Sequence, residues 1–108
     1  MARNGFQSCI DNCHACAASC DVCAASSLDE REAKKLILCI RLDMDCAQVC
    51  RLAASYLSRG SHFAQMACKV CAEICEACAK ECARHDLEPC RRCARSCLAC
   101  ADGCREMA

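Results

Sequence analysis

The 108-residue sequence contains no tryptophan, one tyrosine, two phenylalanines, one proline and three glycines. Leucine, isoleucine, valine and phenylalanine together supply only 17 residues, too few for an ordinary aliphatic core. The scarcity of proline and glycine and the formal net charge of zero nevertheless argue against a disordered chain. A neutral chain also lacks the basic face that nucleic-acid binding needs, so we expect no nucleic-acid partner. The length suits a single domain, which we place at residues 1–108.

Long apolar runs are missing as well. The N-terminal segment MARNGFQSCIDNC has no continuous apolar stretch of the length that an export signal needs. No segment approaches the ~18 uncharged apolar residues of a membrane span. We therefore expect a cytoplasmic protein with no membrane partner, in a compartment where thiols stay reduced.

Cysteine and alanine are abundant instead, with 18 and 20 residues. The cysteines form four groups whose internal steps are three, four or seven residues: Cys9, Cys13, Cys16, Cys20 and Cys23; Cys39, Cys46 and Cys50; Cys68, Cys71, Cys75, Cys78 and Cys82; Cys90, Cys93, Cys97, Cys100 and Cys104. These steps place cysteine at the inward positions of a heptad repeat, whereas a strand would need steps of two. The sequence therefore predicts an all-α fold.

The breaks between the cysteine groups predict helices over residues 4–26, 28–58, 61–85 and 87–106. Ser27 and Glu30 have the spacing of a capping box for the second helix, and Gly60 suits the position after its end. Asp86 can cap the fourth helix. Short connections make neighbouring helices antiparallel, so we expect an up-down-up-down four-helix bundle with a Cys-lined core.

Six Cys-x-x-Cys pairs lie in phase on three of these helices, which indicates a shared role for the thiols. Alanine or valine would fill a core without the risk of oxidation, which argues against a purely structural role. Cysteines three or four residues apart on a helix have Cβ atoms ~5–6 Å apart, too far for a disulfide, so any disulfides would have to run between helices. Metal binding is the favoured interpretation.

Thiolates select soft ions, which are Cu(I), zinc or iron in iron–sulfur clusters. Bridging thiolates allow about one Cu(I) per cysteine, and equal numbers of Cu(I) and thiolate leave the buried core neutral. Zinc held by three or four thiolates each would leave it strongly anionic. We therefore expect a non-enzymatic store of many Cu(I) ions, about one per cysteine, since no nucleophile with a positioned base is evident. A general zinc or cadmium sink, an iron–sulfur electron carrier and a disulfide scaffold remain alternatives.

A few other residues join or flank the inward positions. Asp43 lies between Cys39 and Cys46 in the heptad, either as an oxygen ligand or hydrogen-bond partner for thiols, or as a partner in a salt bridge to an arginine or another helix. His85 follows Cys82 by three residues, either as a metal ligand or as a histidine that stabilises a helix end. His14 and His62 fall off the inward set and are expected on the surface. At the opposite end we expect an apolar plug formed by three side chains that Tyr56 flanks: Leu57, Phe63 and Met107.

The stretches CIRLDMDCAQVC (39–50), CAEICEACAKECARHD (75–86) and CRRCARSCLACADGCREM (90–107) make the sequence recognisable. With its four cysteine groups in matching order, the chain resembles the bacterial copper storage proteins, specifically their cytosolic and most Cys-rich branch. The resemblance covers essentially the whole chain. It implies a homotetramer of bundles, each filled with Cu(I) through thiolates from all four helices. We also expect a copper chaperone as a partner, either as donor or as acceptor.

The same resemblance implies that copper is loaded at one end of the bundle, near histidines. Members of the family tend to have more histidines just before the last helix than this chain, whose corresponding stretch is His85-Asp86-Leu87-Glu88-Pro89.

Overall fold

The computed structural model describes residues 2–108, with side chains from Phe6 onward. Four α-helices and one short 3-10 helix follow each other along the chain: α1 (Ala2–Leu28), η1 (Ala33–Leu36), α2 (Ile37–Arg59), α3 (Ala64–Cys82) and α4 (Glu88–Met107). The described residues contain no strand. The prediction of an all-α fold is confirmed.

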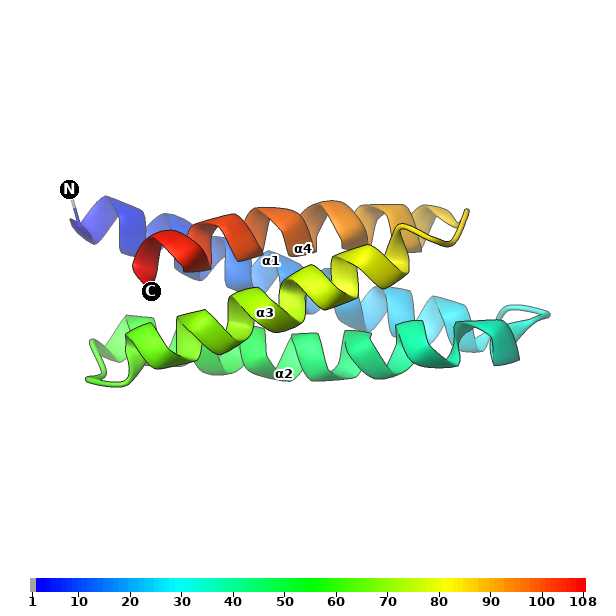
Figure 1. Cartoon of the computed structure of the whole chain (residues 1–108), viewed down its shortest axis with the longest axis horizontal. Coiled ribbons are helices and arrows are strands. Elements are labelled where there is room, and N and C mark those ends of the chain that lie inside the picture. Colours follow the sequence, from blue (N-terminus) through cyan, green and yellow to red (C-terminus); the bar gives the residue numbers. More distant parts are fainter. Residues whose placement is uncertain (1) are drawn as a thin grey trace.

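The helices form an antiparallel bundle that measures 46 × 19 × 17 Å along its principal axes. Both chain ends lie at the end of the bundle where α2 connects to α3, and the α1–α2 and α3–α4 connections lie together at the other end (Figure 1). This is the predicted up-down-up-down order. We call the end with the α1–α2 and α3–α4 connections the His85 end, and the opposite end the Phe63 end. Across residues 2–108, no helix has both the length and the apolar character of a membrane span.

Small side chains on the flanks of each helix allow the close packing that a sulfur-lined core requires. Alanines such as Ala17, Ala47, Ala72 and Ala101 are almost fully buried beside the cysteines. Alanine also has the highest intrinsic helix propensity, so the same residues favour the helices and let them approach each other.

The start of the second helix differs from the prediction. The chain makes turns after Leu28, then the 3-10 helix η1, and α2 begins only at Ile37. Ser27 caps no helix, because it lies in the last turn of α1 with 1 % of its surface exposed. Ser27 follows Cys23 by four residues and so continues the inward face of α1, and its burial there keeps the segment helical.

Two other boundaries differ by a few residues. The helix α3 begins at Ala64 and ends at Cys82, so His85 lies in the turn after the helix. Asp86 does not cap α4: Leu87 occupies the cap position without a side-chain hydrogen bond, and Asp86 pairs with Arg91. The expectation for Gly60 is confirmed, since its φ of 65° gives α2 a left-handed C-terminal cap that glycine adopts without strain.

Candidate metal centre

The core of the bundle is a column of thiols. All 18 cysteines are buried, and Cys9, with 2 % of its surface exposed, is the most accessible of them. No disulfide joins them within residues 2–108. The inward direction predicted for every cysteine by the heptad spacing is therefore confirmed.

The column consists of layers to which each helix contributes one residue. The four complete layers, from the His85 end, are Cys23, Cys39, Cys82 and Cys90; Cys20, Asp43, Cys78 and Cys93; Cys16, Cys46, Cys75 and Cys97; Cys13, Cys50, Cys71 and Cys100. Cys9, Cys68 and Cys104 form a fifth layer at the Phe63 end, where the heptad of α2 supplies the buried Ala53 instead of a thiol. The two inward positions of these layers that hold no cysteine, Asp43 and Ala53, thus both lie on α2.

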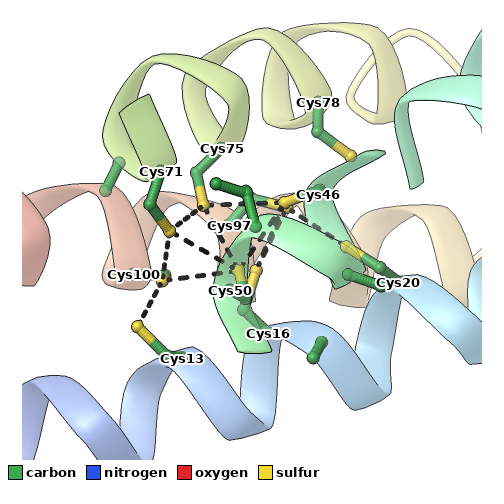
Figure 2. Close-up of a cluster of buried hydrophobic side chains, with 14 of the residues drawn as sticks. Cys13, Cys16, Cys20, Cys46, Cys50, Cys71, Cys75, Cys78, Cys97 and Cys100 are labelled. Atoms are coloured by element: carbon green, nitrogen blue, oxygen red, sulfur yellow. Dashed lines mark hydrogen bonds between the residues drawn. The ribbon is translucent and has the colours of Figure 1, made fainter. Parts of the chain in front are cut away.

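Sulfur atoms are in contact within layers and between them. In the middle of the column, the Sγ atom of Cys46 lies 3.5 Å from that of Cys75, and the Sγ atom of Cys16 lies 3.5 Å from that of Cys97. Figure 2 shows these thiols converging from all four helices on one axis. Several sets of four thiols have all their sulfur atoms within 4.8 Å of one another, among them Cys16, Cys46, Cys50 and Cys75, and Cys13, Cys71, Cys100 and Cys104. Such spacing lets one thiolate contact two neighbouring metal ions, which suits bridged Cu(I).

Asp43 is fully buried among the thiols of the second layer. One carboxylate oxygen accepts hydrogen bonds from Cys78 and Cys93 at 3.3 Å and from Cys82 at 3.5 Å, and the other accepts one from Cys39 at 3.8 Å. The structure shows no basic partner for Asp43 among the described residues, so the predicted salt bridge is wrong and the predicted contact with thiols is confirmed.

Asp43 contacts members of two groups of hydrogen-bonded thiols. Five thiols at the His85 end are hydrogen-bonded to one another: Cys23, Cys39, Cys78, Cys82 and Cys90. Twelve thiols form a second, deeper group: Cys9, Cys13, Cys16, Cys20, Cys46, Cys50, Cys71, Cys75, Cys93, Cys97, Cys100 and Cys104. The Asp43 carboxylate contacts both groups, and the Sγ atom of Cys78 also lies within 4.8 Å of those of Cys20, Cys93 and Cys97, so the column of thiols is continuous here. Cys68 belongs to neither group.

Burial and hydrogen bonding shift the ionisation of the core. Desolvation raises the pKa of Asp43 to about 8, so the carboxyl group is mostly protonated at neutral pH in the metal-free protein. Desolvation also raises the pKa of Cys68 to about 11 and that of Cys90 above its usual value. Because cysteine binds metal as a thiolate, loading of such protonated thiols with Cu(I) releases protons.

His85 lies at the end of the column where Cys23, Cys39, Cys82 and Cys90 form the first layer. Its side chain is 19 % exposed, and its Nε2 atom lies 2.9 Å from a carboxylate oxygen of Glu81. The ring lines a surface hollow with residues of both connections, Leu36 and Leu87 among them. His85 thus lies at the same end of the bundle as the first thiol layer, and Glu81 is a partner that the sequence analysis did not identify.

Two more buried residues lie at this end, of which the sequence analysis expected Leu36 there but not Ser27. Ser27 lies with its hydroxyl 4.0 Å from the Sγ atom of Cys23, and Leu36 is 5 % exposed. The heptad could have identified Ser27, because Ser27 follows Cys23 at the next inward step. The position of Leu36 depends on η1, which the sequence pattern did not predict.

The Phe63 end is less tightly closed than predicted. Leu57 is buried and Met107 packs partly against the core, but Phe63 is 61 % exposed and takes no part in a plug. Phe63 precedes α3, so it lies outside the heptad that directs residues inward and instead lines a surface hollow with Tyr56. His14 and His62 are exposed, as expected.

Comparison with known proteins gives one consistent result. The family model for the copper storage protein (Csp) matches residues 2–108. The "Uncharacterized cysteine-rich protein YhjQ" of Bacillus subtilis (strain 168) is 42 % identical over 102 residues, which cover 94 % of each chain.

Solved structures agree with the chain in fold as well as in sequence. The Cu(I)-bound copper storage protein BsCsp3 is 41 % identical, with a TM-score of 0.92 and coverage of 96 % of this chain and 98 % of that one. A cytosolic copper storage protein from Streptomyces lividans, in a structure with five coppers, is 40 % identical, with a TM-score of 0.94. The match covers 97 % of this chain and 92 % of that one. These proteins share both the four-helix fold and the extent of the chain. The chain therefore belongs to the copper storage protein family.

Proposed function

We propose that this protein stores Cu(I) in the cytosol, with the 18 core cysteines as ligands and with Asp43 and His85 as additional ligands. The sulfur column carries this proposal: thiols from all four helices meet at 3.3–3.9 Å over consecutive layers. A single tetrahedral zinc site needs only four ligands, whereas a continuous column suits many ions that share thiolates. About one Cu(I) per thiolate leaves such a buried column neutral.

Asp43 and His85 differ from the thiols in the role that each would have. The carboxylate of Asp43 contacts thiols of the first and second layers, which supports a role as an oxygen ligand where copper passes from the first layers to the deeper ones. His85 is partly exposed beside the first layer, and a neutral imidazole offers Cu(I) a first ligand before the ion exchanges onto thiolates. We infer that copper is loaded and removed at the His85 end, by exchange with a chaperone.

A homotetramer is the oligomeric state that we propose for the single 1–108 domain. Leu52, Phe63, Met66 and Val70 leave 43–64 % of their surfaces exposed on α2, α3 and the turn between them, around one surface hollow. Contiguous apolar side chains of this kind mark protein–protein contacts more often than free surface. A second copy of the chain is the partner that we propose for this face.

Titration of the reduced protein with Cu(I), against a competing chelator, tests the storage function. We expect about one tightly bound Cu(I) per cysteine, with the protein remaining monodisperse. Saturation at four or fewer ions would contradict storage. Equal capacity and affinity for zinc or cadmium would instead support a general thiol sink, and a brown protein with visible absorption after purification would indicate an iron–sulfur carrier. A matched titration of His85→Ala should reach nearly the same capacity, because His85 contributes one ligand beside 18 thiols.

A further inference from the structure

We propose that Glu81 is a positioning residue that holds the His85 imidazole in one tautomer and orientation for the transfer of Cu(I). This inference rests on the proposed role of His85 as the first copper ligand. It adds a residue that does not touch copper itself.

The contact between Glu81 and His85 is short, and the carboxylate is shielded from water. The Nε2 atom of His85 lies 2.9 Å from Oε2 of Glu81, and the Glu81 side chain is 9 % exposed. The other oxygen, Oε1, accepts a hydrogen bond from Arg84 at 3.2 Å, and the side chain of Arg84 is 69 % exposed. Each carboxylate oxygen therefore has its own partner, and the one that faces His85 is not shared with Arg84.

The backbone alone does not hold His85 in place. The helix α3 ends at Cys82, and His85 follows in a turn where its backbone N–H donates to the carbonyl of Cys82 at 3.1 Å. Beyond the last helical turn, the orientation of an imidazole depends on side-chain contacts. The hydrogen bond to Glu81, four residues earlier, ties the ring back to the body of α3.

The hydrogen bond also determines which nitrogen is free. Glu81 can accept but not donate while it is ionised, so Nε2 of His85 carries the proton and donates it to the carboxylate. The lone pair of the neutral ring then lies on Nδ1, which is the nitrogen left to bind Cu(I). Carboxylates that bind the second nitrogen of a histidine fix its tautomer and raise its basicity as a ligand, and their removal typically costs metal sites about 10- to 100-fold in affinity or activity.

Stopped-flow transfer of Cu(I) from a Cu(I)–chelator complex to the reduced protein tests the proposal. The variants are Glu81→Ala, Glu81→Gln, His85→Ala and the double variant Glu81→Ala/His85→Ala, with Arg84→Ala as the matched control. We expect Glu81→Ala and His85→Ala to slow transfer about equally, by roughly tenfold. Glu81→Gln should recover most of the rate, because its amide oxygen still accepts from Nε2. Arg84→Ala should stay within about twofold of wild type.

Three measurements separate positioning from a loss of structure. The double variant should be no slower than His85→Ala, because Glu81 acts only through His85. In the metal-free protein, the 15N shifts of His85 should report the Nε2–H tautomer in wild type and Glu81→Gln, and a mixture in Glu81→Ala. Total Cu(I) capacity and the helical circular dichroism spectrum should be the same in all variants.

Transfer by Glu81→Ala at the wild-type rate, with His85→Ala slow, would overturn the role of Glu81 and leave copper storage intact. A double variant clearly slower than His85→Ala would overturn it too, because Glu81 would then act independently of His85. Transfer by His85→Ala at the wild-type rate would overturn the proposal as well, because His85 would then have no role in transfer for Glu81 to support. Failure of the storage function would show differently, as a low Cu(I) capacity in wild type.

Discussion

The carboxylate of Asp43 on α2 lies 3.3 Å from the thiol of Cys93 on α4, at the centre of a core that is otherwise lined by sulfur. Cysteine at this position would have completed a four-thiol layer. The position instead holds a titratable carboxyl group in contact with thiols of the first and second layers. Its burial makes the stability of the metal-free protein depend on pH in a direction that can be calculated.

Burial raises the pKa of Asp43 from its ordinary value of 3.8 to about 8 in the folded protein. Because the folded pKa is raised, the folded state binds more protons than the unfolded state between these values. The contribution of Asp43 to stability is therefore fully present below about pH 4 and is lost as the pH rises through 8. Between about pH 4 and pH 8, the contribution of Asp43 to the free energy of unfolding changes by on the order of 5 kcal/mol.

Urea unfolding of the reduced, metal-free protein between pH 4 and pH 8 tests this dependence, with Asp43→Asn as the comparison. The amide has the same shape and does not titrate, so the stability of the variant relative to wild type should rise with pH. Stability curves that run parallel across this range would show that Asp43 ionises as it does in water.

Gly60 and Gly103 offer a matched pair of substitutions with opposite expected effects. At Gly103, inside α4, an added Cβ atom would meet Asn12 at 3.5 Å and Cys9 at 3.7 Å, which are ordinary van der Waals distances. Gly103→Ala should therefore stabilise the protein by roughly 0.5–1 kcal/mol, because glycine is costly within a helix. Gly60 has a φ of 65°, so Gly60→Ala should destabilise it by about 1 kcal/mol.

Thermal or urea unfolding of the metal-free protein measures both effects. A Gly103→Ala variant less stable than wild type would mean that α1 and α4 cannot accommodate even a methyl group beside Cys9. An unchanged stability for Gly60→Ala would mean that the left-handed cap of α2 contributes nothing.

The metal-free, reduced protein should already be folded. The described polar side chains that are buried all have hydrogen-bond partners, and protonated thiols pack as small apolar groups. Twenty alanines further favour the helices. Circular dichroism of the reduced protein in the presence of a Cu(I) chelator should show a helical spectrum and a cooperative thermal transition. A random-coil spectrum that becomes helical only on addition of Cu(I) would contradict this expectation.

The apolar face around Phe63 and Val70 should be required for assembly. Val70→Lys places a charge in a face where Val70 is now 45 % exposed, and it should shift the proposed tetramer toward smaller species. Leu28→Lys is the matched control, since Leu28 is 64 % exposed at the end of α1 and lies away from this face. Light scattering after size exclusion measures the mass. A Val70→Lys protein of wild-type mass would show that this face is free in solution.

The sequence by itself determined the architecture and the chemistry of the core. Steps of three and four between cysteines admit only a helix with its thiols on one face, and every one of the 18 cysteines is buried as that period requires. The same period placed Asp43 among the thiols, because an inward heptad position holds whatever residue occupies it.

Only the tertiary structure decided what lies at the two ends of the column. The capping-box spacing of Ser27 and Glu30 favoured a helix start, but burial of Ser27 beside Cys23 extended α1 instead. Phe63 is apolar and lies in the connection between α2 and α3, but it precedes the first residue of α3 and its side chain is exposed at the surface. The pairing of His85 with Glu81 depends on where α3 ends. Heptad periodicity specifies direction within a helix, but it carries no information about residues beyond the last turn, where contacts between elements determine the position of each side chain.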